Sequence, residues 1–515
     1  MKHFQPLTFV VSLMLSCLSS QTALAATPSG GNNASYSGAS SAACEAKASW
    51  FNSPSFPKEV AEEKNCDFHQ FMWQSFLYLV QPANEQTQAA TKSKKQVSAP
   101  LNFETWMPSH GIFVKEGEMP EPWGNTPAIP RCENGTLSNK TANHDPSYQF
   151  ASLTLQAGSH QPLIDREMNP VFYTVSVNQP AYGFLTQCDL YKAQCGMSLA
   201  PGIVNNTSLD ILNIPKKYPT LAFPVDSVEL KMSWKVLTSA QASSGLFYTT
   251  QGTTLSQDGT CAEAVTLGLV GMHIVSKTPN HPEFIWATFE HKNNAPYCTD
   301  LNAQAPLGGD WSFYNQSCKS GECANLNEYD PNKPAQVCRA HPWGDPTLGE
   351  FVNGLDCSST PPPHYICEKQ VQQNVIDPNT ANLKSINASM TALLQALPTS
   401  NPNRLWANYE LVGNLWTLGG LLPPELQYQR GSLSAANTTM ETFVQNGVSG
   451  VTSAASCFGC HNQEGHTLAK PGEPSLERLR LPPAGLSHIF NLINNQSQGC
   501  DQGTSLPNAC AVFQK

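Results

Sequence analysis

The segment Cys457-Phe458-Gly459-Cys460-His461 has the residue types and the spacing that could do chemistry. Two thiols about one helical turn apart can form thioether bonds with the two vinyl groups of a porphyrin, and the histidine that follows can bind the iron. This C-x-x-C-H pattern is the attachment signature of c-type haem. We therefore expect one covalent haem c, bound through Cys457, Cys460 and His461, with His461 as the metal ligand.

Three other kinds of site use two cysteines at this spacing. A thioredoxin-like dithiol needs a strand before the pair and a helix after it, whereas SGVTSAAS precedes this one. A structural zinc site needs four ligands, which usually include a second C-x-x-C or a histidine pair. A plain structural disulfide would make the chain an exported binding module without haem. We favour haem and keep these alternatives open.

The residue on the other side of the iron decides between two haem functions. Two strong axial ligands favour electron transfer, whereas an open position permits peroxidase- or oxygenase-like chemistry with the rest of the chain as substrate pocket. Class I cytochromes c use a methionine several dozen residues after the motif, but this chain has no methionine after Met440. The second ligand is therefore a nearby histidine, an upstream residue, or absent. The candidates are His488, His466, Met440, Met272, His273 and His291.

The first 25 residues have the features of a cleaved export signal. Lys2 precedes an apolar run from Leu7 to Leu18, and Ala23-Leu24-Ala25 fits the small-x-small cleavage rule. We expect cleavage after Ala25 and a location in the periplasm, and the alternative is a lipoprotein anchored through Cys17. No later stretch is apolar over the roughly 18 residues that a membrane helix needs.

The cysteine count agrees with an oxidising compartment. Setting aside Cys17 and the motif pair leaves fourteen of the 17 cysteines, and an even set in an exported chain predicts disulfides. Connectivity does not follow from spacing, but short separations favour certain pairs. The predicted pairs are Cys188–Cys195, Cys318–Cys323, Cys357–Cys367 and Cys500–Cys510, followed by Cys44–Cys66, Cys261–Cys298 and Cys132–Cys338.

The elements that must position the motif follow an α+β pattern. Apolar residues at helical spacing predict helices over 66–80 and 383–397, and a further one near 436–445. Between about 100 and 300, short runs rich in β-branched and aromatic residues alternate with Pro, Gly and Asn, which is typical of strands and turns. The predicted strands are 170–178, 225–237, 243–251, 267–277 and 283–292, and the last two form a hairpin.

These elements divide the chain into four parts. Residues 1–25 are the signal peptide, and 26–43 are a flexible polar leader. Residues 44–430 form a large β-rich domain with disulfides, including disulfide-tied loops over 300–370. Residues 431–515 form a mainly helical, cytochrome c-like segment that binds haem. The formal charge of −10 at pH 7 provides no basic surface, so we expect no nucleic acid as a partner.

The motif SCFGCHN occurs with the upstream pieces ELVGNLW and NTTMETF and with the predicted hairpin GMHIVSKTPNHPEFIWATFEH. In these pieces the chain resembles a group of large bacterial exported mono-haem cytochrome c proteins. The resemblance implies haem attachment through Cys457 and Cys460 and iron binding by His461. It implies transfer of single electrons to or from a redox partner protein or a small molecule, and no known substrate. The single C-x-x-C-H separates the chain from di-haem peroxidases.

Overall fold

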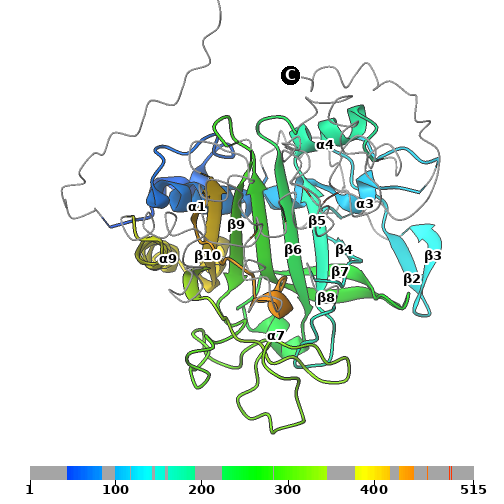
Figure 1. Ribbon diagram of the computed structural model, residues 1–515. Coiled ribbons are helices and arrows are strands. Elements are labelled where there is room, and N and C mark those ends of the chain that lie inside the picture. Colours follow the sequence, from blue (N-terminus) through cyan, green and yellow to red (C-terminus); the bar gives the residue numbers. More distant parts are fainter. Residues whose placement is uncertain are drawn as a thin grey trace, which may run out of the picture. The chain divides into compact units, whose positions relative to one another are not determined.

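The computed structural model describes nine stretches of the chain and four single residues near its C-terminus (Figure 1). They belong to one unit, Ala43–Lys515. They combine a large, mostly antiparallel sheet with a few helices, so the predicted α+β class is confirmed at this level. The predicted signal and the cytochrome c-like helices lie outside the described residues. The described residues are 43–83, 99–115, 117–141, 145–156, 161–191, 223–281, 283–344, 377–417 and 429–445, with Cys457, His461, Ser487 and Ile489.

The sheet has nine strands within the described residues. Their bounds are β1 Met107–Pro108, β4 Gln149–Ala151, β5 Phe172–Val177, β6 Val228–Val236, β7 Thr249–Leu255, β8 Cys261–Ser276, β9 Ile285–His291, β10 Tyr409–Thr417 and β11 Gln429–Gly431. The order is β1-β5-β6-β8-β9-β10-β11, β7 pairs with β8, and β4 pairs parallel to β7. A separate hairpin pairs β2 (Pro130–Glu133) with β3 (Thr136–Thr141).

The predicted hairpin between 267–277 and 283–292 is confirmed. β8 and β9 pair antiparallel, from Gly271 opposite Glu290 to Ser276 opposite Ile285. The strands predicted at 170–178 and 225–237 are β5 and β6. The strand predicted at 243–251 starts later, because the reciprocal bonds of a capping box, between Thr238 and Gln241, begin a short helix, α7 (Ser239–Ser243), in front of β7.

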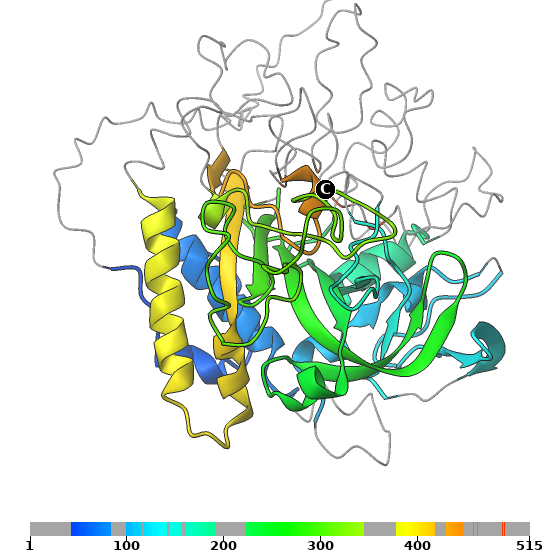
Figure 2. The same ribbon diagram turned by 90° about the horizontal axis from the view of Figure 1, so that it is seen from below.

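Both long predicted helices are confirmed. α1 (Asn65–Leu79) and α9 (Asn379–Gln395) lie side by side and contact β10 on one face of the sheet (Figure 2). The Asp377 carboxylate, just before α9, accepts a 2.6 Å hydrogen bond from the Asn65 N–H and so satisfies a free donor at the start of α1. Phe76 of α1 stacks on Phe289 of β9 with ring centroids 4.4 Å apart. Fully burying such a ring contributes about 1.5–3 kcal/mol.

The remaining helices within the described stretches are short. They are α3 (Ser109–Ile112), α4 (Gln179–Gln187) and the 3-10 turns η1 (Ala48–Asn52), η2 (Asn102–Thr105), η3 (Pro342–Gly344), η5 (Pro402–Asn408) and η8 (Thr442–Val444). No helix among the described residues is long and apolar enough to cross a membrane.

The helix predicted near 436–445 is wrong. This segment is a buried turn that ends in η8. Its side chains bond to the backbone locally, because the Asn437 Oδ1 accepts from both the N–H and the hydroxyl of Thr439, at 2.8 and 2.7 Å. The turn packs so closely on β8 that a Cβ on Gly271 would lie 2.7 Å from the Thr439 hydroxyl. Residues 431–445, assigned above to the haem-binding segment, thus pack onto the sheet.

The disulfides confirm two predicted pairs and correct two. Cys44–Cys66 and Cys318–Cys323 are present. The predictions Cys261–Cys298 and Cys132–Cys338 are wrong, because the chain joins Cys132 to Cys261 and Cys298 to Cys338. Cys132 lies on β2, and the Gly135 carbonyl of the β2–β3 hairpin accepts a hydrogen bond from the Cys261 N–H. The hairpin therefore brings Cys132 next to Cys261, although 129 residues separate them in the sequence. Cys188 is disulfide-bonded. The predicted partner Cys195 and the pairs Cys357–Cys367 and Cys500–Cys510 lie outside the described residues.

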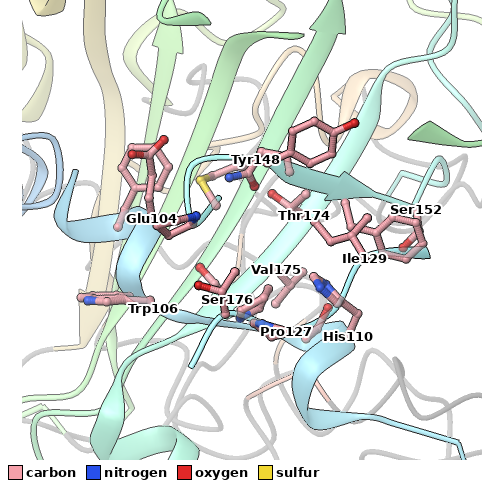
Figure 3. Close-up of a pocket in the computed structure, with 18 of the residues that line it drawn as sticks. Glu104, Trp106, His110, Pro127, Ile129, Tyr148, Ser152, Thr174, Val175 and Ser176 are labelled. Atoms are coloured by element: carbon pink, nitrogen blue, oxygen red, sulfur yellow. The ribbon is translucent and has the colours of Figure 1, made fainter. Parts of the chain in front are cut away.

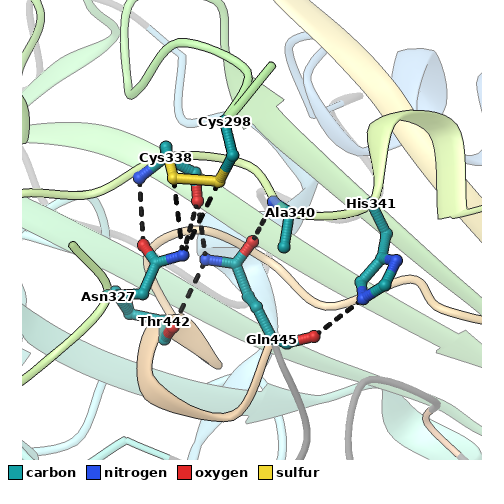
Figure 4. Close-up of a disulfide and its surroundings, with 7 residues drawn as sticks. All are labelled: Cys298, Asn327, Cys338, Ala340, His341, Thr442 and Gln445. Atoms are coloured by element: carbon teal, nitrogen blue, oxygen red, sulfur yellow. Dashed lines mark hydrogen bonds between the residues drawn. A yellow bond between two sulfur atoms is a disulfide. The ribbon is translucent and has the colours of Figure 1, made fainter. Parts of the chain in front are cut away.

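The Cys298–Cys338 disulfide closes the loops between these two residues, and hydrogen bonds beside it join them to the buried turn (Figure 4). The Asn327 side chain bonds to both the N–H and the C=O of Cys338, at 2.9 and 3.0 Å. Gln445, at the end of the buried turn, donates to the same carbonyl and accepts from the Ala340 N–H. These loops therefore hold Gln445, which precedes the C-x-x-C-H motif by twelve residues, in a fixed position.

Candidate functional site

Two residues of the C-x-x-C-H motif are described, and they lie one helical turn apart. The His461 N–H donates a 2.8 Å hydrogen bond to the Cys457 carbonyl, which is the i to i+4 bond of an α-helix. Both side chains are half-buried, and Cys457 carries a thiol. Cys460 lies outside the described residues. The first thiol and the imidazole thus have the separation along one turn that the predicted attachment chemistry requires.

The His461 ring lies against Trp286 of β9. The two ring centroids are 4.4 Å apart, with an angle of 49° between the planes. Trp286 is only 6% exposed, and its indole N–H donates a 3.0 Å hydrogen bond to the Glu283 carbonyl. The Glu283 carboxylate is buried beside the His281 ring, at 2.9 Å from its Nδ1. The indole therefore has a fixed orientation against the histidine of the motif.

Trp286 belongs to an apolar cluster on the face of the sheet opposite α1 and α9. Alternation along β9 puts Trp286 on this face, whereas Ala287 and Phe289 join the core beneath the helices. Cys457 packs at the edge of this Trp286 cluster. Its members are Met107, Ile112, Val177, Ala181, Phe184, Leu185, Cys188, Leu190, Tyr191, Phe223, Val275, Phe284, Trp286, Leu415, Leu433 and Ile489.

The C-terminal residues Ser487 and Ile489 lie on the same face. Ile489 is 3% exposed within the Trp286 cluster. The Ser487 hydroxyl donates a 2.8 Å hydrogen bond to the Oε2 of Glu229 on β6. Glu229 pairs in register with Val275, which pairs with Trp286. The motif and a segment some thirty residues after it therefore meet on three neighbouring strands.

The surroundings of the Glu229 carboxyl group disfavour its ionised form. Its Oε1 is shielded from solvent without a hydrogen-bond partner. Burial raises the pKa of Glu229 to about 7, and the hydrogen bond from Ser487 opposes this only in part. The group is therefore close to half-protonated at neutral pH, near the residues that contact the motif.

The carboxylate of Glu441 lies further along the same face, beside His273. The His273 Nε2 on β8 lies 3.1 Å from the Glu441 carboxylate. Burial pushes the pKa of Glu441 upward, but the neighbouring His273 and Lys231 and its hydrogen bonds outweigh this, so the pKa is lowered. Burial lowers the pKa of Lys231, and the attraction of Glu441 offsets part of that effect. His273 thus has a carboxylate partner that competes with any role as an iron ligand.

The structure separates the other candidates for the second ligand. Met272 is directly opposite Phe289 in the core beneath the helices, so it faces away from Trp286. His291 also points to that side and bonds the Leu246 carbonyl at 3.0 Å, and burial lowers its pKa to about 4. Met440 is fully buried in a separate cluster with Tyr173 and Val270.

His466 and His488 lie outside the described residues. His488 nevertheless stands between Ser487 and Ile489, which both contact the face that carries Trp286. Of the candidates that the structure describes, His273 is the one on this face. Within the described parts of the chain, no three His, Cys, Asp or Glu side chains gather as a protein-only metal site would require.

The donor set at Cys457 and His461 fits a c-type haem. A thiol and an imidazole follow each other on one helical turn, and beside them lies an apolar cluster with an aromatic wall. Comparison of the chain with family models, with curated proteins and with solved structures finds no match.

Sequence reasoning missed Trp286, Glu229 and Ser487 as parts of the site. The period-2 pattern of WATFEHK places Trp286 and Glu290 on one face of a strand, but it does not say which face the motif meets. Glu229 sits in VELKMSWKV as an ordinary polar residue of an alternating strand. Only the register of β6, β8 and β9 brings these residues together.

Proposed function

We propose that the chain is a periplasmic c-type cytochrome, exported with cleavage after Ala25, that transfers single electrons to or from a redox partner protein or a small molecule. The observation that carries the proposal is the position of Cys457 and His461 on one helical turn against Trp286. A covalently attached haem supplies an iron that accepts and gives up one electron. One C-x-x-C-H motif corresponds to one such group.

The residues of the site have separate roles in this proposal. Cys457 and Cys460 would hold the haem covalently, and His461 would bind its iron. Trp286 packs against the imidazole and, held by its bond to the Glu283 carbonyl, limits the rotation of that ring. The apolar side chains around Trp286 keep water away from the histidine, which is one of the means by which a protein sets a redox potential.

His488 is our candidate for a second residue that would bind the iron. Its two neighbours in sequence touch the face of the sheet on which His461 lies, whereas Met272 and His291 point to the other face. Two imidazole ligands would close the coordination of the iron, which favours electron transfer over chemistry on a bound substrate.

The test is a pyridine haemochrome spectrum of the full chain, exported in a bacterium that has haem c maturation machinery. We expect a c-type band with one haem per chain, and its loss in Cys457→Ala/Cys460→Ala. The matched control is Cys318→Ala/Cys323→Ala, which removes a disulfide that closes only five residues of chain and should keep the haem. A wild-type chain without a c-type band would refute the proposal.

Spectra of the ferric protein test the second ligand. We expect His488→Ala to convert a low-spin iron to high spin and to allow carbon monoxide to bind the ferrous form. His273→Ala, on the same face, should leave the spin state unchanged. The opposite result would assign the ligand to β8, and a high-spin wild type with fast carbon monoxide binding would contradict an electron-transfer role.

A further inference from the structure

A cavity of about 50 Å³ lies at the β1–β5 edge of the sheet, and its use is not explained by the haem proposal (Figure 3). Its wall comes from η2, α3, the loop around Pro127, the chain leading into β4, and β5. The polar residues that matter in this wall are Glu104, His110, Tyr148, Thr174 and Ser176.

The register of the edge strands brings His110 and Ser176 into the same wall. Pro108 of β1 lies directly opposite Ser176 of β5, and α3 starts at the next residue and carries His110. Gly111 lets α3 approach Pro127 closely, because a Cβ there would lie 2.4 Å from the Pro127 Cγ. The wall is therefore built from tightly fixed backbone.

Two polar atoms in this wall are buried without a partner. They are the Ser176 hydroxyl, on a residue that is 5% exposed, and the Nε2 of His110. By contrast, Thr174 accepts from the Trp234 indole at 2.8 Å, and the Tyr148 hydroxyl lies 3.1 Å from the Thr253 hydroxyl. Since most buried polar atoms in proteins have a partner, two unpaired atoms in one cavity wall indicate a missing hydrogen-bonding molecule.

The electrostatics of the wall favour an uncharged occupant. Burial lowers the pKa of His110 to about 4, so its imidazole is neutral at neutral pH. Burial raises the pKa of Glu104 to about 7, and both its oxygens already accept hydrogen bonds, from Tyr248 and from the Leu101 N–H. The described residues of the lining include no lysine or arginine. An anion would lose its hydration here without gaining a counter-charge, and a cation would have to compete for Glu104 oxygens that already accept hydrogen bonds.

We propose that this cavity binds a small uncharged molecule that bears an amide or hydroxyl group, hydrogen-bonded to the His110 Nε2 and the Ser176 Oγ. The volume limits the molecule to about four non-hydrogen atoms, since each water-sized group needs roughly 10–15 Å³. The ring of Phe150, 5.2 Å from that of His110, adds an apolar surface for the rest of the molecule. This is the usual composition of a small-molecule site, with apolar walls and few polar groups.

The test uses acetamide as the probe, with acetate and ethylammonium as charged molecules of similar size. Ligand-observed saturation-transfer NMR with the full exported chain measures binding at neutral pH. We expect saturable binding of acetamide and at least tenfold weaker binding of either ion. Equal binding of acetamide and an ion, or no saturable signal from acetamide, would overturn the proposal.

Ser176→Ala locates the binding site with little change in packing. We expect acetamide to bind about tenfold more weakly to this variant, because one hydrogen bond is lost. Ser75→Ala, which removes a buried hydroxyl from α1, should bind like the wild type. Equal affinities of the two variants would refute the site. A crystal structure with acetamide that shows only water between His110 and Ser176 would also refute it.

Discussion

The buried carboxyl of Glu229 makes a quantitative prediction about stability and pH. Its pKa is raised from 4.5 to about 7 in the folded chain, so the folded state holds this proton more tightly than the unfolded state does. The contribution of Glu229 to the free energy of unfolding is therefore greatest below pH 4.5, and it falls as the pH rises toward 7. A tenfold change in proton affinity corresponds to about 1.4 kcal/mol, so ionised Glu229 costs up to about 3 kcal/mol.

Glu229→Gln removes this cost, because the amide keeps the shape and an acceptor for Ser487 but cannot ionise. Urea unfolding curves, followed by tryptophan fluorescence with disulfides intact, give the free energy of unfolding at each pH. We expect the variant to match the wild type near pH 4 and to exceed it by about 2–3 kcal/mol at pH 8. The control is Glu118→Gln, which changes an exposed carboxyl. A difference between Glu229→Gln and wild type that stays constant from pH 4 to 8 would refute the reasoning.

Two further predictions concern stability. Glu290→Gln leaves the buried Arg339 guanidinium without its bidentate partner, and unfolding titrations should show a loss of about 3–5 kcal/mol. Lys58→Met breaks the exposed ion pair with Asp226, whose two side chains are 68% and 40% exposed, and should lower the free energy of unfolding by less than about 1 kcal/mol. Equal losses in Glu290→Gln and Lys58→Met would contradict the argument. Replacing the Cys298–Cys338 pair by alanines should cost about 4 kcal/mol, against about 2 kcal/mol for Cys318–Cys323, because the first closes 40 residues and the second 5. A larger loss for the short loop would contradict this order.

The elements that the sequence predicts well are those with a local signal. The helices over 66–80 and 383–397 have apolar residues at helical spacing. The first occurs within one residue of its predicted limits and the second within four. The β8–β9 hairpin follows from two β-rich runs around a Pro- and Asn-containing turn. In each case neighbouring residues carry the whole pattern.

The features that were missed depend on pairing between distant parts of the chain. Cys132 and Cys261 meet because the β2–β3 hairpin lies beside the start of β8, which no spacing of cysteines encodes. The segment ANTTMETFVQ has a helical composition, but Asn437 and Thr439 satisfy each other in a turn. The candidate site divides in the same way. The C-x-x-C-H motif is recognised from the sequence itself. Trp286 and Glu229 lie near it only because of the register of three strands, which the sequence does not specify.

The buried turn at 437–439 has a consequence for the order of biogenesis. The Thr438 N–H donates to Glu290 at 2.7 Å, so the ion pair on β9 is completed by a residue made about 150 positions later. A chain that emerges from its N-terminus cannot close this part of the sheet until residue 438 has followed, and the first motif cysteine comes only 19 residues after that. In the proposed cytochrome, haem attachment to Cys457 and closure of the sheet would therefore fall in the same short interval of export.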